Sequence, residues 1–280
     1  MNICLLSFDV EDWFQVENLR EAIPRASWNR YELRVIENTH RLLEILERNN
    51  TKATFFVLGW IADKVPQLIK EIHRAGHEIA SHGYEHELIY KQTPKAFQED
   101  IHRSKRLLED LTGEVVLGYR APSFSITETA IEVLVEEGFV YDSSLFPSAL
   151  HDRYGKMPLS PEQSSRGIIN LRPYFFEILI PTLQFFGLRI PWGGGGYFRV
   201  LPYRVFRWGV RKILSKQGNY LFYLHPWEID PEQPRIQNIR LMYRFRHYVN
   251  LQTTEAKLKR LLTDFRFFPI HHGLKELGYL

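Results

Sequence analysis

The feature that most constrains the fold of this chain is an alternation of short apolar runs with longer helical segments. The apolar runs are rich in β-branched and aromatic residues, which is typical of buried strands, and they lie at 3–6, 53–58, 77–80, 115–118 and 220–224. Apolar residues at helical spacing, proline near the start and glycine after the end mark the helical segments 32–49, 61–75, 93–111 and 127–137. Strands that alternate with helices predict parallel pairing through right-handed crossovers. We therefore expect an α/β fold, most securely over the first 145 residues.

Polar and titratable residues follow these predicted strands directly. The first strand ends in the acidic stretch 9–12, the third at His82, the fourth at Arg120 and the last at His225. Folds built from parallel strands place their functional sites at the carboxyl ends of those strands. The sequence therefore predicts one site that gathers these residues.

Two histidines at i and i+4, His82 and His86, suggest a metal ligand pair. On a helical turn both imidazoles would face the same side, and one carboxylate from elsewhere would complete three ligands. Three protein ligands leave one coordination position open, which is typical of catalytic zinc sites rather than structural ones. A pair with this spacing also occurs on surface helices that bind no metal, so the order of the other motifs is needed to support it.

Composition limits the classes of function. With 280 residues, 44% of them hydrophobic, the chain can bury a large core, and we expect a single domain over 1–280. The net charge of +3 is too small to indicate nucleic-acid binding. No apolar stretch approaches the length that spans a bilayer, and no signal peptide is evident, so a cytoplasmic location is expected. The oligomeric state is not determined by these features.

Four motifs together resemble a known family. Ser-Phe-Asp at 7–9, Ser-His-Gly-Tyr-Glu-His at 81–86, Tyr-Arg-Ala-Pro at 119–122 and Leu-His-Pro at 224–226 occur in the order seen in polysaccharide deacetylases with the NodB homology domain, carbohydrate esterase family four. This resemblance implies a distorted (β/α) barrel of about seven parallel strands. It also implies a metal-dependent enzyme that removes N-acetyl groups from amino sugars of a polysaccharide or its oligosaccharide precursor, so the expected partner is an N-acetylated glycan.

A narrower resemblance is to a bacterial subgroup associated with exosortase and exopolysaccharide loci. It depends on Phe-Asp-Val-Glu-Asp-Trp-Phe at 8–14, His-Asp-Arg-Tyr-Gly at 151–155, Gly-Gly-Gly-Tyr-Phe-Arg at 194–199, His-Pro-Trp-Glu-Ile-Asp at 225–230 and Arg-His-Tyr-Val-Asn at 246–250. It implies an insertion at about 147–200 and a C-terminal extension at about 228–280. The subgroup suggests a place peripheral to the membrane where exopolysaccharide is made.

Amide hydrolysis assigns chemical roles to the matching residues. Asp9 is the candidate general base, Arg120 would keep that carboxylate ionised, and His225 is the candidate general acid for the leaving amine. Asp142 could orient His225, and a backbone N–H near Ser123 could bind the oxyanion. Each residue also has a structural interpretation, since Asp9 could cap a turn, Arg120 could form a loop salt bridge and His225 could be a core histidine.

The third metal ligand is open between two carboxylates. The family motif has adjacent aspartates, whereas this chain spaces them as Asp9-Val10-Glu11-Asp12. On an extended strand Glu11 shares a face with Asp9 and Asp12 does not, but that parity ends with the strand. We favour Asp12, because a short carboxylate disturbs the family geometry less. Zinc is the expected metal, with cobalt or nickel also compatible with a nitrogen and oxygen ligand set.

Two alternatives to a deacetylase follow from the same residues. Some relatives with a spaced first motif are cyclic amide hydrolases or lack a metal. A non-catalytic glycan-binding protein on this fold is the other alternative, and it would predict loss of the base or the acid, which the sequence does not show.

The run Trp192-Gly193-Gly194-Gly195-Gly196-Tyr197-Phe198 is the other conspicuous segment. It lacks the Gly-Lys-Ser/Thr of a phosphate-binding loop. Glycines allow a backbone to approach a ligand closely, and Trp192, Tyr197 and Phe198 could stack on a sugar ring. We therefore expect a substrate-binding segment, with a glycine-rich surface turn as the alternative.

Overall fold

The computed structural model describes residues 2–147, 163, 167–185 and 187–280. The motif at 151–155 lies outside these residues, and so does most of the first part of the expected insertion. The strands are β1 (Ile3–Val10), β2 (Thr54–Val57), β3 (Glu78–Ser81), β4 (Gly118–Tyr119), β5 (Tyr141–Asp142), β6 (Ile168–Arg172), β7 (Phe175–Ile178), β8 (Thr182–Phe185), β9 (Leu188–Pro191), β10 (Asn219–Leu224) and β11 (Phe267–Phe268).

Helices connect most of these strands. The α-helices are α1 (Val35–Arg48), α2 (Gly59–Lys64), α3 (Pro66–Arg74), α4 (Pro94–Thr112), α5 (Glu128–Glu136), α6 (Gly195–Val200), α7 (Tyr203–Gln217), α8 (Leu241–Tyr248), α9 (Leu251–Asp264) and α10 (Ile270–Glu276). Short 3₁₀ turns include η1 (Glu17–Leu19), η2 (Arg25–Arg30), η3 (Ile89–Lys91), η4 (Pro122–Phe124) and η6 (Pro226–Ile229). None of the helices in the described part of the chain is long and apolar enough to cross a bilayer.

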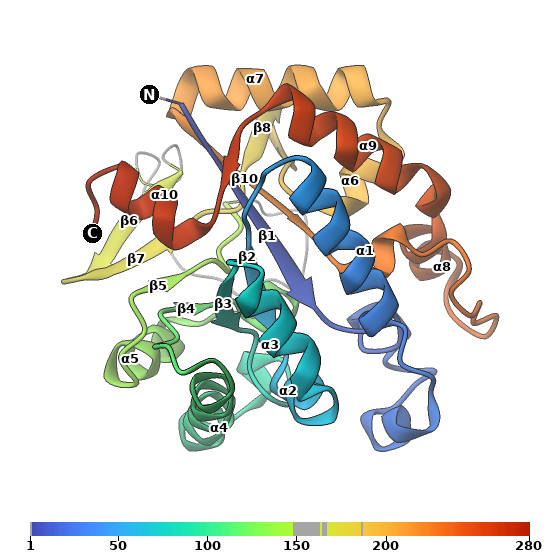
Figure 1. Cartoon of the computed structure of the whole chain (residues 1–280), viewed down its shortest axis with the longest axis vertical. Coiled ribbons are helices and arrows are strands. Elements are labelled where there is room, and N and C mark those ends of the chain that lie inside the picture. The colour runs from blue at the N-terminus through green and yellow to red at the C-terminus, as the bar shows by residue number, and fades with distance from the viewer. Residues whose placement is uncertain (1, 148–162, 164–166, 186) are drawn as a thin grey trace.

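The main sheet has the order β10-β1-β2-β3-β4-β5-β7-β6, with β11 also paired to β1. Along this order β10, β1, β2, β3, β4, β5 and β7 are parallel to their neighbours, and only β6 is antiparallel. The sheet is curled into an open half-barrel with helices around its outer face (Figure 1). The expected α/β fold with about seven parallel strands is therefore confirmed.

Helix boundaries follow the expected local signals. Thr93 caps α4 by accepting a hydrogen bond from the Ala96 N–H, and Gly113 ends that helix at a φ of +75°. The predicted helix 61–75 is divided into α2 and α3 at Val65, because a residue before proline is disfavoured in the helical region.

Strand β1 is buried along its whole length, as expected for a parallel strand covered on both faces. Leu6, Phe8 and Val10 belong to the core under the outer helices, whereas Ile3 and Leu5 belong to the core inside the half-barrel. That inner core includes residues of α10, which packs against β1. Apolar side chains therefore fill the amino end of the barrel interior and leave its carboxyl end to polar groups.

Candidate active site

Strand β1 carries a column of polar side chains toward the carboxyl end of the barrel interior. Ser7 and Asp9 share the face of Ile3 and Leu5, because side chains alternate along a strand. Glu11 continues this column past the end of β1, and its N–H donates to the carbonyl of Asp9 at 3.0 Å. All three side chains are buried. The alternation of side-chain directions thus persists for one residue beyond the end of β1.

The side chain of Asp12 points to the opposite side from that of Glu11 and has a structural role. Its carboxylate accepts hydrogen bonds from the backbone N–H groups of Trp13 at 2.8 Å, Arg34 at 2.8 Å and Val35 at 3.0 Å. These contacts fix the start of α1 against the end of β1. The preference for Asp12 as metal ligand is therefore corrected, because strand parity turns its oxygens away from the histidines.

His82 and His86 lie in a loop after β3, not on a helical turn as expected. Gly83 has a φ of +72° and His86 a φ of +52°, so the chain turns back on itself between the two imidazoles. Asp100 of α4 holds this loop by accepting the N–H of Tyr84 at 2.7 Å and that of Glu85 at 2.9 Å. Asp100 could not be predicted from the sequence, since nothing in its helical pattern distinguishes it from surface acids.

Glu11, His82 and His86 form a group that could hold a metal ion. Their ligand atoms lie within 4.8 Å of one another, and all three residues are buried. Nδ1 of His82 lies 2.8 Å from the carbonyl oxygen of Arg120, so a proton on Nδ1 leaves the Nε2 lone pair free for a metal.

Two further observations fit a cation at this position. Oε2 of Glu11 has no hydrogen-bond partner among the described residues, although Nε2 of His86 is only 2.6 Å away. Burial lowers the pKa of His82 to about 4, which keeps its imidazole neutral. Burial alone would raise the pKa of Glu11, but His86, His225 and His82 outweigh it and lower that pKa. A neutral imidazole and an ionised carboxylate are the forms that bind metals.

Arg120 ties the site to the sheet. Its fully buried guanidinium donates to Asp9 Oδ1 at 2.6 Å, to Ser7 Oγ at 2.9 Å, and to the carbonyl and hydroxyl oxygens of Ser143, each at 2.9 Å. A buried charge is costly unless it is paired and hydrogen-bonded, and here both conditions are met. Asp9 is consequently held in one orientation, with its second oxygen directed toward His225.

His225 lies at the carboxyl end of β10, in contact with three carboxylates. Its Nε2 is 3.7 Å from Asp9 Oδ2 and 3.3 Å from Glu11 Oε1, and its Nδ1 is 2.8 Å from Glu228 Oε1. Burial opposes a charge on this imidazole, but Glu11, Glu228 and Asp9 outweigh burial and raise the pKa of His225 to about 9. The side chain is 18% exposed, so it remains accessible from the cavity.

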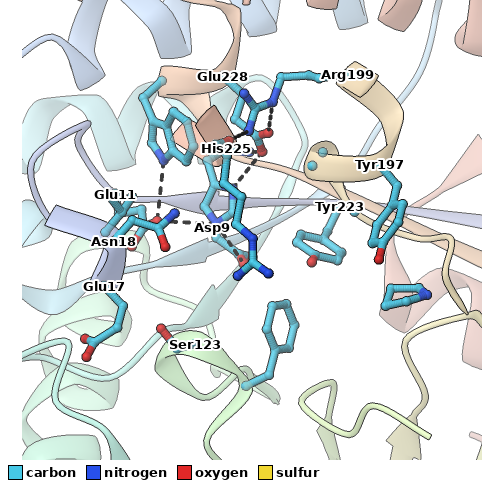
Figure 2. Close-up of a pocket in the computed structure, with 18 of the residues that line it drawn as sticks. Asp9, Glu11, Glu17, Asn18, Ser123, Tyr197, Arg199, Tyr223, His225 and Glu228 are labelled. Atoms are coloured by element: carbon cyan, nitrogen blue, oxygen red, sulfur yellow. Dashed lines mark hydrogen bonds and ion pairs between the residues drawn. The ribbon is translucent and has the colours of Figure 1, made fainter. Parts of the chain in front are cut away.

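Glu228 is in turn held by Arg199, whose Nε donates to Glu228 Oε2 at 2.8 Å. The remaining guanidinium nitrogens of Arg199 donate to the carbonyls of Arg246, His247 and Val249. Figure 2 shows the Arg199, Glu228 and His225 side chains in sequence above Asp9. Sequence reasoning missed Glu228, although an acid three residues after His225 in a Pro-initiated turn was a usable signal.

Asp142 does not reach His225, which corrects its expected role. It lies in β5, several strands from β10 in the sheet order, and accepts a hydrogen bond from Ser144 Oγ at 2.6 Å. Across the strand pair it faces Glu177, whose Oε1 accepts the N–H groups of Ser144 and Leu145. Burial raises the pKa of Asp142 to about 6 and that of Glu177 well above its usual range, so the two carboxyl groups can share one proton.

A cavity of 420 Å³ opens over these residues. Asp9, Glu11, His82, His86 and His225 are all in its lining. Ser123 also lines it, with its backbone at a φ of 50°, and the Tyr197 and Tyr223 rings stand on another wall (Figure 2). Residues from β1, the β3 loop, η4, α6 and β10 therefore converge on one space.

The glycine-rich segment plays a different part from the expected one. Trp192 is buried, stacks on Phe206 and donates its indole N–H to the Phe206 carbonyl, and Phe198 is fully buried. Of the three aromatic residues, only Tyr197 lines the cavity. The expectation that Trp192 and Phe198 stack on substrate is therefore wrong, because their apolar rings are used by the core.

The glycines serve close packing within the protein. A Cβ on Gly194 would come within 2.3 Å of the Tyr223 hydroxyl, and one on Gly195 within 2.1 Å of Glu228 Oε2. Gly194 and Gly195 therefore pack against Tyr223 and Glu228, which line the cavity with them. Among the four glycines of this run, Gly196 alone has free space at its Cβ position, and it also lines the cavity.

Two family models match this chain. Residues 31–141 match the polysaccharide deacetylase family, and residues 143–275 match a family described as a domain of unknown function, DUF3473. The second segment supplies His225, Glu228 and Arg199, and its strands β7 and β10 pair with strands of the first part of the chain. Both segments therefore contribute to the same sheet and the same cavity.

Known proteins resemble this chain over part of its length. A peptidoglycan deacetylase of Helicobacter pylori is 36% identical over 105 residues, which is 38% of this chain and 36% of that protein. This chain spans between 20% and 38% of the length of the curated relatives it matches.

Solved structures share the fold. A putative polysaccharide deacetylase from Mycobacterium smegmatis has a TM-score of 0.60 at 21% identity, covering 95% of this chain and 86% of that one. A carbohydrate esterase family four pseudoenzyme from Bacillus anthracis has a TM-score of 0.51 at 15% identity, covering 97% of this chain and 64% of that one. The same fold thus occurs in proteins described as enzymes and in a pseudoenzyme.

Proposed function

We propose that this chain, whose residues 31–141 match the polysaccharide deacetylase family, is a metal-dependent enzyme that hydrolyses N-acetyl groups of amino sugars in a glycan. The observation that carries this proposal is the convergence of Asp9, Glu11, His82, His86 and His225 in the lining of one cavity. The relative from Helicobacter pylori is named a peptidoglycan deacetylase, and the glycan here is proposed to be a polysaccharide or its oligosaccharide precursor. The exopolysaccharide-associated subgroup and a cytoplasmic location are parts of the same proposal.

The proposed metal ligands are Glu11, His82 and His86, and the donor set of two nitrogens and one oxygen suits zinc, cobalt or nickel. A divalent metal bound there would polarise the acetyl carbonyl and acidify water. Burial keeps His82 neutral, and the Arg120 carbonyl orients its ring. Asp100 does the same for the loop by fixing the backbone between the two histidines.

Asp9 is proposed to accept a proton from the attacking water. Arg120 donates a hydrogen bond of 2.6 Å to one oxygen of Asp9 and leaves the other directed toward His225, so the carboxylate is positioned before substrate arrives. His225, protonated through its raised pKa, is proposed to donate a proton to the amine nitrogen as the C–N bond breaks. Its Nε2 lies 3.7 Å from Asp9, so base and acid stand on the same side of the cavity.

A non-catalytic role is the weaker interpretation. Fold alone does not decide the matter, since a pseudoenzyme shares it. A binding protein would need neither Asp9 held by a buried arginine nor a charged His225 beside it, because burying the guanidinium and the charged imidazole is costly. A cyclic amide hydrolase would use similar catalytic groups, so the substrate that is hydrolysed distinguishes it from a deacetylase.

The test is acetate release by the purified, zinc-loaded protein from N-acetylated oligosaccharides, with a panel of cyclic amides assayed in parallel. Asp9→Asn is expected to retain metal and to lose roughly 10²–10⁴-fold in rate, the usual range for removal of a general base. Ring opening of a cyclic amide without acetate release would favour the alternative enzyme. Sugar binding without either reaction would favour a binding protein.

A further inference from the structure

Helix α8 brings an apolar stripe to the mouth of the cavity. Met242, Phe245 and Val249 follow one another at helical spacing, and all three line the cavity together with Val200 of α6. Met242 is 60% exposed, Phe245 55% and Val200 45%. The stripe thus begins inside the cavity and continues onto the outer surface.

The aliphatic and thioether side chains of this wall, Val200, Met242 and Val249, are poorly matched to a sugar. Pyranose rings present hydroxyl groups around their edge, which hydrogen-bond to polar side chains, whereas aliphatic and thioether side chains offer no donors or acceptors. Contiguous exposed apolar side chains beside a cavity are typical of a surface that binds an apolar ligand. Because this stripe is continuous with the site, its occupant is most simply another part of the substrate.

A cation accompanies the stripe. Arg246 also lines the cavity, one residue after Phe245, and its side chain is exposed. Its backbone carbonyl accepts from Arg199, but its guanidinium makes no ion pair with any described carboxylate. A free guanidinium at the boundary between a polar site and an apolar wall suits a phosphate group, which it can bind through two hydrogen bonds.

We propose that the substrate is an amphiphilic glycan, in which a phosphate or diphosphate joins the N-acetylated sugar to an apolar chain. The sugar occupies the cavity over Asp9 and His225, the phosphate meets Arg246, and the apolar chain lies along Met242, Phe245 and Val200. This inference rests on the proposed deacetylase function and adds the substrate class. Under this inference, the segment 143–275, which matches a domain of unknown function, contributes to substrate selection.

The experiment compares three forms of one sugar: free N-acetylglucosamine oligosaccharide, N-acetylglucosamine with a methyl diphosphate, and N-acetylglucosamine joined through diphosphate to a farnesyl chain. Acetate release and, separately, binding by calorimetry are measured below the micelle concentration. The wild-type protein is expected to prefer the farnesyl form to the methyl form by about tenfold or more in kcat/KM and in Kd, since several methylene groups leave water. The double variant Met242→Ser/Phe245→Ser is expected to reduce that ratio toward one.

Controls separate this inference from general damage and from other causes. Leu241→Ser changes an apolar residue of α8 that is even more exposed, at 80%, but does not line the cavity, and the farnesyl preference is expected to stay. Arg246→Gln is expected to weaken both diphosphate forms about equally. Equal kcat/KM and Kd for the farnesyl and methyl forms in the wild-type protein, or an unchanged ratio in the double variant, would overturn the inference.

Two other outcomes are also informative. Binding to phosphatidylglycerol vesicles that depends on Met242 and Phe245, without any farnesyl preference, would assign the stripe to a membrane surface and overturn the inference. Preferential binding of the farnesyl form without acetate release from any sugar would refute the proposed deacetylase activity while supporting the assignment of the stripe.

Discussion

The carboxylate of Glu228 lies 2.8 Å from Nδ1 of His225, three residues earlier in the chain. Its other oxygen is held by Arg199, so the carboxylate cannot turn away from the imidazole. This contact orients the ring and presents Nε2 to the cavity. It gives His225 the carboxylate partner that sequence reasoning had sought in Asp142.

Replacing Glu228→Gln is expected to lower the pKa of His225, because the amide keeps a hydrogen-bond acceptor but removes a negative charge. In the wild-type, metal-free protein that pKa is raised to about 9. Titration of the His225 ring by NMR in chelator-treated protein measures the shift. Glu232 is an exposed acid four residues after Glu228, and Glu232→Gln is the matched control, which should leave the pKa of His225 unchanged.

Glu11→Gln and Asp12→Asn are expected to have opposite effects. Glu11→Gln removes a proposed ligand, so metal affinity should fall by more than the roughly 10–100-fold lost when an outer-shell partner is changed. Asp12→Asn should keep the metal but lower the free energy of unfolding by about 1–3 kcal/mol, because backbone N–H groups at the start of α1 lose acceptors. Zinc content after dialysis and urea unfolding measure the two effects. An empty site in Asp12→Asn with full zinc in Glu11→Gln would restore the original assignment.

Asp100→Asn is expected to reduce metal affinity by about 10–100-fold without removing any ligand. The amide can accept only one of the two N–H groups that the carboxylate now binds, so the turn between His82 and His86 becomes less well fixed. Competition with a fluorescent zinc chelator gives the affinity. Asp110 is exposed on the same helix, so Asp110→Asn is the control. A similar loss of metal affinity in Asp110→Asn would contradict the role given to Asp100.

Trp192→Ala and Tyr197→Ala should separate core packing from substrate contact. Trp192 is 5% exposed and stacked on Phe206, so its loss is expected to cost about 3–5 kcal/mol of folding stability. Tyr197 lines the cavity, so Tyr197→Ala should raise KM for an oligosaccharide with little change in the free energy of unfolding. Urea unfolding and steady-state kinetics on both variants test the division. A destabilised Tyr197→Ala protein with unchanged KM would argue against a substrate contact.

The Asp142 and Glu177 pair is expected to make stability depend on pH. Burial raises the pKa of both carboxyl groups, so the folded protein keeps a proton that the unfolded chain releases at a lower pH. Folding therefore takes up a proton once pH rises above the unfolded carboxyl value of about 4, and the pair's contribution then falls by up to about 1.4 kcal/mol per pH unit until pH passes the raised pKa values. Glu177→Gln should remove this slope, so the difference in unfolding free energy between variant and wild type should grow with pH. Glu136→Gln, an exposed acid, should give a pH-independent difference.

Much of the fold followed from local patterns. The apolar runs marked the strands of the parallel sheet, and caps such as Thr93 and Gly113 marked the helix ends, because these signals depend on residues close in sequence. The same patterns placed Asp9, His82, Arg120 and His225 after strand ends. Parallel strands align their carboxyl ends, so the side chains there had to meet.

Other features depended on contacts between distant segments. The choice of Glu11 over Asp12 was decided by how far strand parity persists beyond β1, and by the backbone N–H groups of Arg34 and Val35 that engage Asp12. The burial of Trp192 and Phe198 was decided by the arrival of Phe206 and Phe222 from α7 and β10.

The sequence by itself determined the order of strands and helices and the residue types available at the site, since both are encoded by periodicity and short motifs. Only the tertiary structure decided which carboxylate meets the histidines, which acid supports His225, and where the apolar stripe of α8 lies. These outcomes depend on side-chain direction and on packing between segments more than two hundred residues apart, such as those of Glu11 and His225. No local pattern carries that information, because a single side chain has the same sequence neighbours whichever distant partner it meets.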